Sequence, residues 1–213
     1  MRKLRALAIF GTLVLILAGC TDEEVVFPTF VAQTLSDQRA DGDIGFSLDP
    51  PPDGTFTISQ ADATGNVIFG LYADGTEFRA FLDFPLDGSN GGDAVPLDAV
   101  ILAADIEIFV NDVALVSTVP TLLDLVPFPI TGLRVTDFDS DPIATRSPFD
   151  FFPSDIGGSV LIDVTSLMAE AQRLGLPDLQ LRFLLDFVPG ASGVVEIDDG
   201  IDLRAPLLTV EYQ

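Results

Sequence analysis

The residues with the clearest chemical pattern are aspartates. Asp137-Phe138-Asp139-Ser140-Asp141 places carboxylates at alternate positions, the spacing with which many calcium loops begin. Pro142 and Pro148 follow at the positions where an EF-hand loop has glycine and glutamate, so this is not an EF-hand. Asp137, Asp139 and Asp141 are therefore candidate calcium ligands outside that motif. Turn formation is the alternative, because aspartate is also favoured in turns.

Two further acidic clusters lie beside glycines. They are Asp37, Asp41 and Asp43 beside Gly42, and Asp198, Asp199 and Asp202 beside Gly200. Carboxylates packed closely repel each other unless a cation or solvent separates them. Loops at one end of a β-sandwich would bring the two clusters together; the alternative is that each cluster is a solvated loop.

An aromatic segment is the other candidate site. Phe149, Phe151 and Phe152 lie in an expected loop bounded by Pro148 and Pro153, and Arg146 comes shortly before them. Exposed aromatic rings can stack on sugars or seat a partner, and apolar patches mark such sites. Arg146, Phe149, Phe151 and Phe152 are therefore candidate ligand-binding residues. Filling of the core is the alternative, because Phe lacks the polar group that suits Tyr and Trp to wet interfaces.

The composition excludes several kinds of catalysis. The chain has no histidine, no tryptophan and a single cysteine. A His-dependent triad, imidazole ligation of a metal and an internal disulfide are thereby excluded. Paired carboxylates can hydrolyse glycosidic bonds, but no spacing here singles out an acid and a base. We predict a non-catalytic protein, with a carboxylate-based glycan-active enzyme as the second alternative.

The charge of the chain is strongly negative. Its formal net charge is −23, which becomes −26 without residues 1–19, because these contain three basic residues and no acid. Such a charge repels nucleic acid, whose binding depends on Lys and Arg, so we expect no nucleic-acid partner. It also attracts cations and supports solubility, which is consistent with calcium binding or with a saline habitat.

The N-terminus has the pattern of an export signal. Arg2, Lys3 and Arg5 precede an apolar run at 6–17, and small residues follow before Cys20. This order predicts a secretory signal over 1–19, and the run is too short for a membrane span. Leu17-Ala18-Gly19-Cys20 resembles the lipobox of bacterial lipoproteins. The resemblance implies cleavage before Cys20 and a lipid anchor on its sulfur. An anchor with about two acyl chains holds a protein firmly at the membrane. An uncleaved anchor or a buried free cysteine is the alternative.

Residues 20–36 are predicted to be a lipidated tether. Thr21-Asp22-Glu23-Glu24 is similar to the surface-export signal of some bacterial lipoproteins, and a solvated tether is the alternative. Thr21 is not the aspartate that retains lipoproteins at an inner membrane, so we expect the outer membrane or the cell surface. Apolar residues between Val25 and Val31 could dock on the domain as an edge strand.

Residues 37–213 have the pattern of one all-β domain. Short runs of alternating apolar and polar residues are separated by turns rich in Gly, Pro and Asp, which favours a sandwich or barrel. Asp83, Gln180 and Arg182 fall on the outward side of their runs by this alternation. The expected strands are Gly45–Leu48, Thr55–Ser59, Val67–Ala73, Glu77–Phe84, Ala99–Val110, Leu133–Phe138, Ser159–Val164, Leu179–Phe187, Val194–Ile197 and Leu207–Tyr212.

Two segments interrupt the strand pattern. Helix formers are concentrated at about 166–174, with Thr165 or Ser166 able to cap the start and Gly175 and Pro177 the end, which predicts one short helix. Val119–Ile130 is apolar but contains three prolines, which disfavour a central strand. We expect that segment to be an insertion folded onto the sandwich or a partner-docking loop.

Several runs resemble, in order, one family of bacterial surface domains. Arg79–Phe84 is similar to its R-A-L-L-R-F strand, Ala103–Val110 to its S-A-T-L-R-L-Y-V strand, Ile162–Leu167 to its V-D-V-T-x-L segment, and Pro206–Tyr212 to its closing P-x-L-x-V-x-Y strand. The chain thus resembles DNRLRE-type domains over about 43–213. The resemblance implies a jelly-roll sandwich related to some carbohydrate-binding modules. Asp83 departs from the family, which often has a basic residue there.

These patterns predict a cell-envelope lipoprotein whose jelly-roll-like antiparallel β-sandwich is a non-catalytic structural or binding module. Calcium is the favoured small ligand. A carbohydrate-binding module for an envelope or extracellular polysaccharide is the first alternative. The expected partners are the membrane, through Cys20, and a polysaccharide or an envelope protein.

Overall fold

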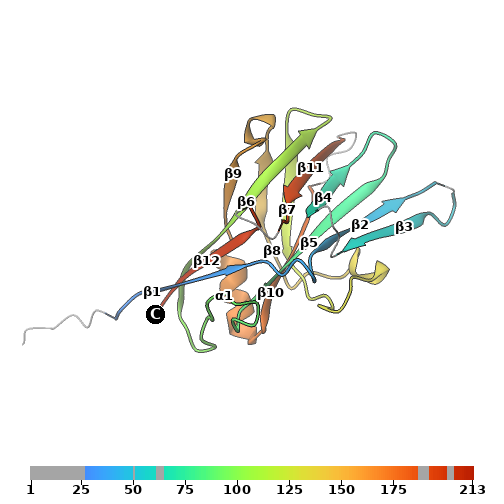
Figure 1. Cartoon of the computed structure of the whole chain (residues 1–213). Helices are drawn as coiled ribbons and strands as arrows, with labels where there is room; N and C mark the ends of the chain where they lie inside the picture. Colours follow the sequence, from blue (N-terminus) through green and yellow to red (C-terminus); the bar gives the residue numbers. More distant parts are fainter. Residues whose placement is uncertain (1–26, 50, 61–64, 187–191, 201–203) are drawn as a thin grey trace, which may run out of the picture.

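The fold is mostly β. The computed structural model describes residues 27–49, 51–60, 65–186, 192–200 and 204–213. The predicted signal at 1–19, Cys20 and Asp202 lie outside the described residues. Within them, twelve antiparallel strands form a strongly curled sheet with one short helix (Figure 1).

The elements follow one another along the whole chain. They are β1 (Phe30–Leu35), β2 (Gly42–Ser47), β3 (Thr55–Gln60), β4 (Asn66–Leu71), β5 (Glu77–Pro85), β6 (Ile101–Ala114), β7 (Val119–Leu125), the 3₁₀ turn η1 (Val135–Asp137), β8 (Ala144–Phe151), the 3₁₀ turn η2 (Pro153–Asp155), β9 (Ser159–Asp163), α1 (Thr165–Leu174), β10 (Asp178–Leu185), β11 (Gly193–Asp198) and β12 (Leu207–Tyr212). The sheet runs β1-β12-β6-β11-β4-β5-β10-β7-β8, with β2 and β3 added beside β5 and β9 beside β6.

The long strand β6 makes the sheet curl. Its first part pairs with β12 and β9, so that Ile106 lies opposite both Leu208 and Ile162. Its last part pairs instead with β11, where the register shifts between Glu196 and Ile197. A register shift of this kind bends a strand and increases its twist. The two parts of the sheet therefore face each other across one core.

The core lies inside the curl and is closed at one end by α1. It contains fully buried side chains from strands far apart in the sequence, among them Phe69, Leu82, Ile108 and Phe183. Leu167, Met168 and Ala171 turn one face of α1 into this core. The helix ends where Gly175 adopts a left-handed φ of 64°, a conformation that glycine allows without strain. The expected short helix is confirmed.

The alternation suggested that the outer face of the sheet around β5 and β10 is exposed to solvent, but the structure covers it. Residues 126–143 fold over it, and Phe128, Leu133 and Phe138 form a second apolar cluster with Ile44 and Phe81. Leu133–Phe138 is therefore not the expected strand but a segment containing η1. Under this cover Asp83, Gln180 and Arg182 are buried rather than exposed.

The prediction for Val119–Ile130 was right only for 126–130, which fold over the sheet, and the prediction of a loop at Phe149 was wrong. Val119–Leu125 is strand β7 and lies between β10 and β8. Its registered pairing with β10 spans Thr121–Leu125, and Pro120 stands at the end of that ladder, where its carbonyl oxygen accepts the N–H of Asp186 at 2.8 Å. A proline is tolerated more readily at the end of a strand than at its centre. Arg146, Phe149 and Phe151 belong to strand β8 and not to a loop.

The sheet begins within the segment expected to be a tether. β1 pairs antiparallel with β12 along its whole length, from Phe30 opposite Tyr212 to Leu35 opposite Leu207. The expectation of an edge strand is confirmed. The start of β1 and the C-terminus consequently lie side by side (Figure 1).

Candidate functional site

The aspartates of 137–141 do not gather around one point. The Asp137 carboxylate turns back and accepts a hydrogen bond from the Arg134 N–H, with Oδ2 2.7 Å from that nitrogen. Asp139 is exposed and pairs with Arg79 at 2.9 Å, while Asp141 is also exposed. Among the residues that the structure describes, no group of three or more carboxylates is placed to hold a metal ion. The structure therefore gives no support to calcium binding by these three residues.

The backbone of this segment is held by arginines. Arg182 Nη1 lies 2.9 Å from the carbonyl oxygens of Phe138 and Ser140 and 3.2 Å from that of Asp137. Its Nη2 forms a buried ion pair with Asp124 at 2.7 Å. Arg79 also donates to the Phe138 carbonyl, and its guanidinium lies 3.9 Å from the centre of the Phe138 ring. Two guanidinium groups of the chain thus supply the positive charge that we had expected from calcium.

The candidate aromatic residues do not form a platform. Phe151 is completely buried and packs edge-on against Phe69 in the main core. Phe149 is half-buried under Arg146, whose guanidinium lies 4.5 Å from the centre of its ring. Of the three candidate phenylalanines, only Phe152 is exposed. Core filling, the alternative at the sequence level, describes Phe151.

The other two acidic clusters do meet. The turn after β1 and the segment after β11 bring Asp41 and Asp199 together, and both are buried. Asp41 Oδ1 accepts the N–H of Asp83 at 2.6 Å, and the Ser36 hydroxyl donates to Asp199 Oδ1 at 3.3 Å. This contact ties together the turn 36–41, strand β5 and the end of β11.

The Asp41 carboxyl group is buried against that of Asp199, and the Ser36 hydroxyl and the Asp83 N–H are further hydrogen-bond donors to it. A hydrogen bond between two carboxyl groups requires a proton on one of them. Burial raises the pKa of Asp41 well above its usual range, and the charge of Asp199 and the hydrogen bond to it raise it further. The protonated form of Asp41 is therefore favoured beside Asp199; we call these two residues the acid pair.

Two neighbouring carboxyl groups are shifted in the same direction. Burial raises the pKa of Asp83 to about 7, while a hydrogen bond from Gln180 Nε2, 2.9 Å from Asp83 Oδ1, opposes the shift. Burial also raises the pKa of Asp178, with help from the charges of Asp87 and Asp37. The interactions that shift these groups within the described residues come from acids, amides, a hydroxyl and the backbone, and not from a basic side chain.

A polar cavity opens beside the acid pair. Its volume is about 510 Å³, and Asp199 forms part of its wall. The other polar side chains around it include Ser36, Asp37, Arg39 and Asn90. Asn90 is fixed by hydrogen bonds between its Nδ2 and both Thr34 Oγ1 (3.0 Å) and the Leu35 carbonyl (2.6 Å). The cavity thus offers carboxylate, amide, hydroxyl and guanidinium groups on a fixed wall.

Sequence reasoning located only part of this site. The clusters beside Gly42 and Gly200 were recognised, and so was the prospect that loops would join them. Asp83 and Asn90 were not recognised as part of it. The sequence did contain a sign that Asp83 is unusual, because it has an acid at a position where the family that it resembles often has a basic residue.

No protein-family model matches the chain, and no curated protein matches it. Within the described part of the chain, no helix has the length and apolar character needed to cross a membrane.

Proposed function

We propose that this chain is an exported, lipid-anchored cell-envelope protein with a non-catalytic binding domain. Support for the anchor comes from Leu17-Ala18-Gly19-Cys20, which follows basic residues and an apolar run. We also propose that the curled sheet is a jelly-roll-like sandwich of the DNRLRE type. The passage of β6 from pairing with β12 to pairing with β11 supports this, because a strand shared by two facing sheets is compatible with such a sandwich.

The polar cavity beside the acid pair is the observation that carries the binding function. Its wall combines hydrogen-bond donors and acceptors, and the hydroxyl groups of a sugar need both. The negative charge of the chain disfavours acidic polymers. The proposed ligand is therefore a neutral, hydroxyl-rich polymer such as an envelope or extracellular polysaccharide, bound at this cavity and not at Phe149.

The acid pair itself argues for binding over hydrolysis. Glycosidases keep their two carboxyl groups about 5–9.5 Å apart so that the sugar or a water fits between them. Asp41 and Asp199 are instead hydrogen-bonded to each other, and Asp41 has no exposed surface. A substrate atom cannot reach between them.

The anchor is tested in a bacterial host that processes lipoproteins. The full chain is expressed, and the N-terminal peptide of the membrane fraction is analysed by mass spectrometry. We expect a peptide that begins at Cys20 and carries the mass of a diacylglycerol. Cys20→Ser should abolish the lipid mass and move the protein out of the membrane fraction. An unmodified Cys20 in the native chain would contradict the anchor.

Ligand binding is tested by electrophoresis of the purified protein in native gels that contain dextran, xylan or mannan. Retardation by one polymer is expected, and Arg39→Ala should weaken it about tenfold through loss of a charged hydrogen bond. Arg134→Ala removes another exposed arginine away from the cavity and should have no effect. Equal mobility in all gels would contradict the proposed ligand class.

A further inference from the structure

One end of the domain carries an exposed apolar patch. Phe27, Phe30, Leu97 and Val100 are 62%, 51%, 72% and 62% exposed, respectively. Singly exposed apolar residues are ordinary, but a group of them marks a contact surface. We call these four residues, with Tyr212, the anchor-side patch.

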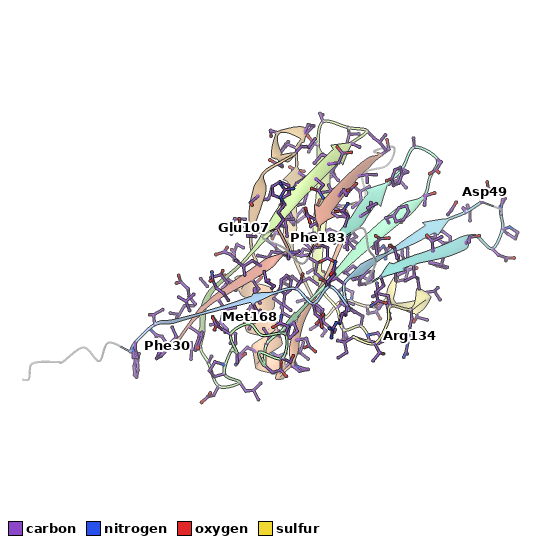
Figure 2. All side chains as sticks on the ribbon, viewed as in Figure 1. Phe30, Asp49, Glu107, Arg134, Met168 and Phe183 are labelled. Carbon is purple, nitrogen blue, oxygen red and sulfur yellow. The ribbon has the colours of Figure 1, made fainter. Side chains whose placement is uncertain are left out.

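The members of this patch are neighbours in space although they come from three parts of the chain. The Phe30 ring stacks on Tyr212 with their centres 5.7 Å apart. Val100 and Gln213 exchange backbone hydrogen bonds of 2.8 and 3.0 Å, and Gln213 Nε2 lies 3.5 Å from the Phe27 carbonyl. Figure 1 shows the start of β1 and the C-terminus together at this end, and Figure 2 shows Phe30 projecting there.

The position of the patch relative to Cys20 indicates what covers it. Phe27 follows Cys20 by only seven residues. Seven residues span at most about 25 Å when fully extended. A lipid on Cys20 would therefore hold the patch within a short distance of the bilayer surface, at a high effective concentration.

We propose that the anchor-side patch rests on the lipid bilayer, so that the domain is oriented on the membrane and not merely tethered to it. This inference rests on the proposed lipid anchor. Phenylalanine and tyrosine rings are favoured at the membrane interface. Asp98 and Glu211 adjoin the patch in sequence and repel anionic lipid, so the surface that it fits has uncharged or zwitterionic headgroups.

The absence of tryptophan from the chain allows a direct test. Phe30→Trp places one reporter in the patch, and Phe152→Trp places one at a site with 42% exposure. Phe152 precedes η2, and Gly157 shortly after η2 donates to the Val110 carbonyl of β6, whereas Tyr212 pairs with Ile101 near the other end of that strand. The nine residue steps from Ile101 to Val110 span about 30 Å along β6, so the two reporters lie near opposite ends of the strand.

Each lipidated single-tryptophan chain is reconstituted in phosphatidylcholine vesicles with or without brominated acyl chains. We expect bromine to quench roughly half of the emission of the Phe30→Trp chain and almost none of that of the Phe152→Trp chain, because only the first reporter enters the interface. Leu97→Ser/Val100→Ser in the Phe30→Trp chain should reduce the quenching. Both side chains are exposed, so its melting temperature should stay close to that of the parent.

Failure of the patch and failure of the anchor are distinguishable. If mass spectrometry finds no lipid on Cys20, the same chains are coupled through this single thiol to maleimide phospholipid, which tests the patch independently. Equal quenching of the two reporters, or none in either, would overturn the proposal. So would a blue shift of the Phe30→Trp emission that depends on protein concentration and not on lipid, because it would identify a second copy as the occupant.

Discussion

The domain buries acidic groups in two regions and stabilises them in opposite ways. Under the segment 126–143, the Asp124 carboxylate is paired with Arg182, and the same guanidinium binds the carbonyls of 137–140. At the acid pair, no basic side chain is among the interactions that shift the pKa of Asp41, and burial and the charge of Asp199 favour its protonated form. The first region is neutralised by an arginine of the chain, whereas the charge of the second depends on pH.

This difference follows from where the arginines lie. Arg79 and Arg182 sit on adjacent strands, β5 and β10, and both point to the outer face that 126–143 covers. Asp83 and Gln180 lie further along the same two strands, where an amide and not a base meets the carboxyl group. On one sheet surface, carboxylates paired with arginine thus give way within a few residues to a carboxyl group whose charge depends on pH. Variants can test the two regions separately.

The largest effect is expected for Arg182→Leu. It leaves Asp124 buried without its partner and removes the donor from three carbonyl oxygens, and breaking a buried ion pair from one side typically costs about 3–5 kcal/mol. Urea unfolding at pH 7 measures the change. Arg173→Leu is the control: Arg173 is exposed and pairs with Glu170 on α1, so its loss should cost less than about 1 kcal/mol. Similar costs for both would mean that the buried pair does not set the stability of this region.

The second prediction concerns pH and the acid-rich end of the sheet. The folded-state pKa of Asp83 is about 7 against an ordinary 3.8, and that of Asp41 is raised as well. Between pH 4 and 7 the folded protein therefore binds more protons than the unfolded chain. The free energy of unfolding should fall by a few kcal/mol as pH rises through this range, because a raised pKa stabilises only while the proton is retained.

Asp83→Asn isolates this contribution. An amide is uncharged at every pH, and its oxygen can still accept the hydrogen bond from Gln180, so the slope of stability against pH should flatten and the variant should gain stability at pH 8. Asp74→Asn is the control. Hydrogen bonds from Thr76 lower the pKa of the exposed Asp74, so Asp74 contributes to the slope of stability against pH only below pH 4. Asp74→Asn should therefore leave the slope between pH 4 and 7 unchanged. A wild-type stability that rises from pH 5 to 8 would refute the raised pKa values at this end.

The third prediction separates two aspartates of one segment. Asp137→Ala removes the buried acceptor of the Arg134 N–H and should cost about 1–2 kcal/mol, as the loss of a helix cap does. Asp139→Ala removes an exposed ion pair and should cost less than about 1 kcal/mol. Chemical unfolding at 0.1 and 1 M salt checks both, since only the cost of Asp139→Ala should decrease with salt. The reverse ranking would contradict the structural role of Asp137.

Local pattern predicted the helix and most of the strands, but not β7, β8 or the 3₁₀ turn within Leu133–Phe138. It succeeded along β5, β6 and β10 because the alternation there records which side faces the main core. It could not predict that the other side is covered. Asp83, Gln180 and Arg182 look like solvent-facing residues when only their own strands are considered, and 126–143 reaches them from far along the chain. Pro120 was misleading for a similar reason, since the cost of a proline depends on which neighbour its strand has at that position.

The smallest expected effect is that of calcium on the segment 137–141. A ligand at 100 times its dissociation constant stabilises a protein by about 2.7 kcal/mol, which a melting experiment detects easily. We expect no calcium-specific shift attributable to Asp137, Asp139 and Asp141, because the carboxylates of Asp137 and Asp139 have separate partners and the carbonyl oxygens already bind Arg182. Melting in calcium, in magnesium at equal ionic strength and in chelator distinguishes site binding from screening of the net negative charge.

A shift seen only with calcium and lost in Asp139→Asn/Asp141→Asn would restore the metal site. It would also mean that Arg79 releases Asp139 when the ion binds, since a carboxylate cannot fully serve both.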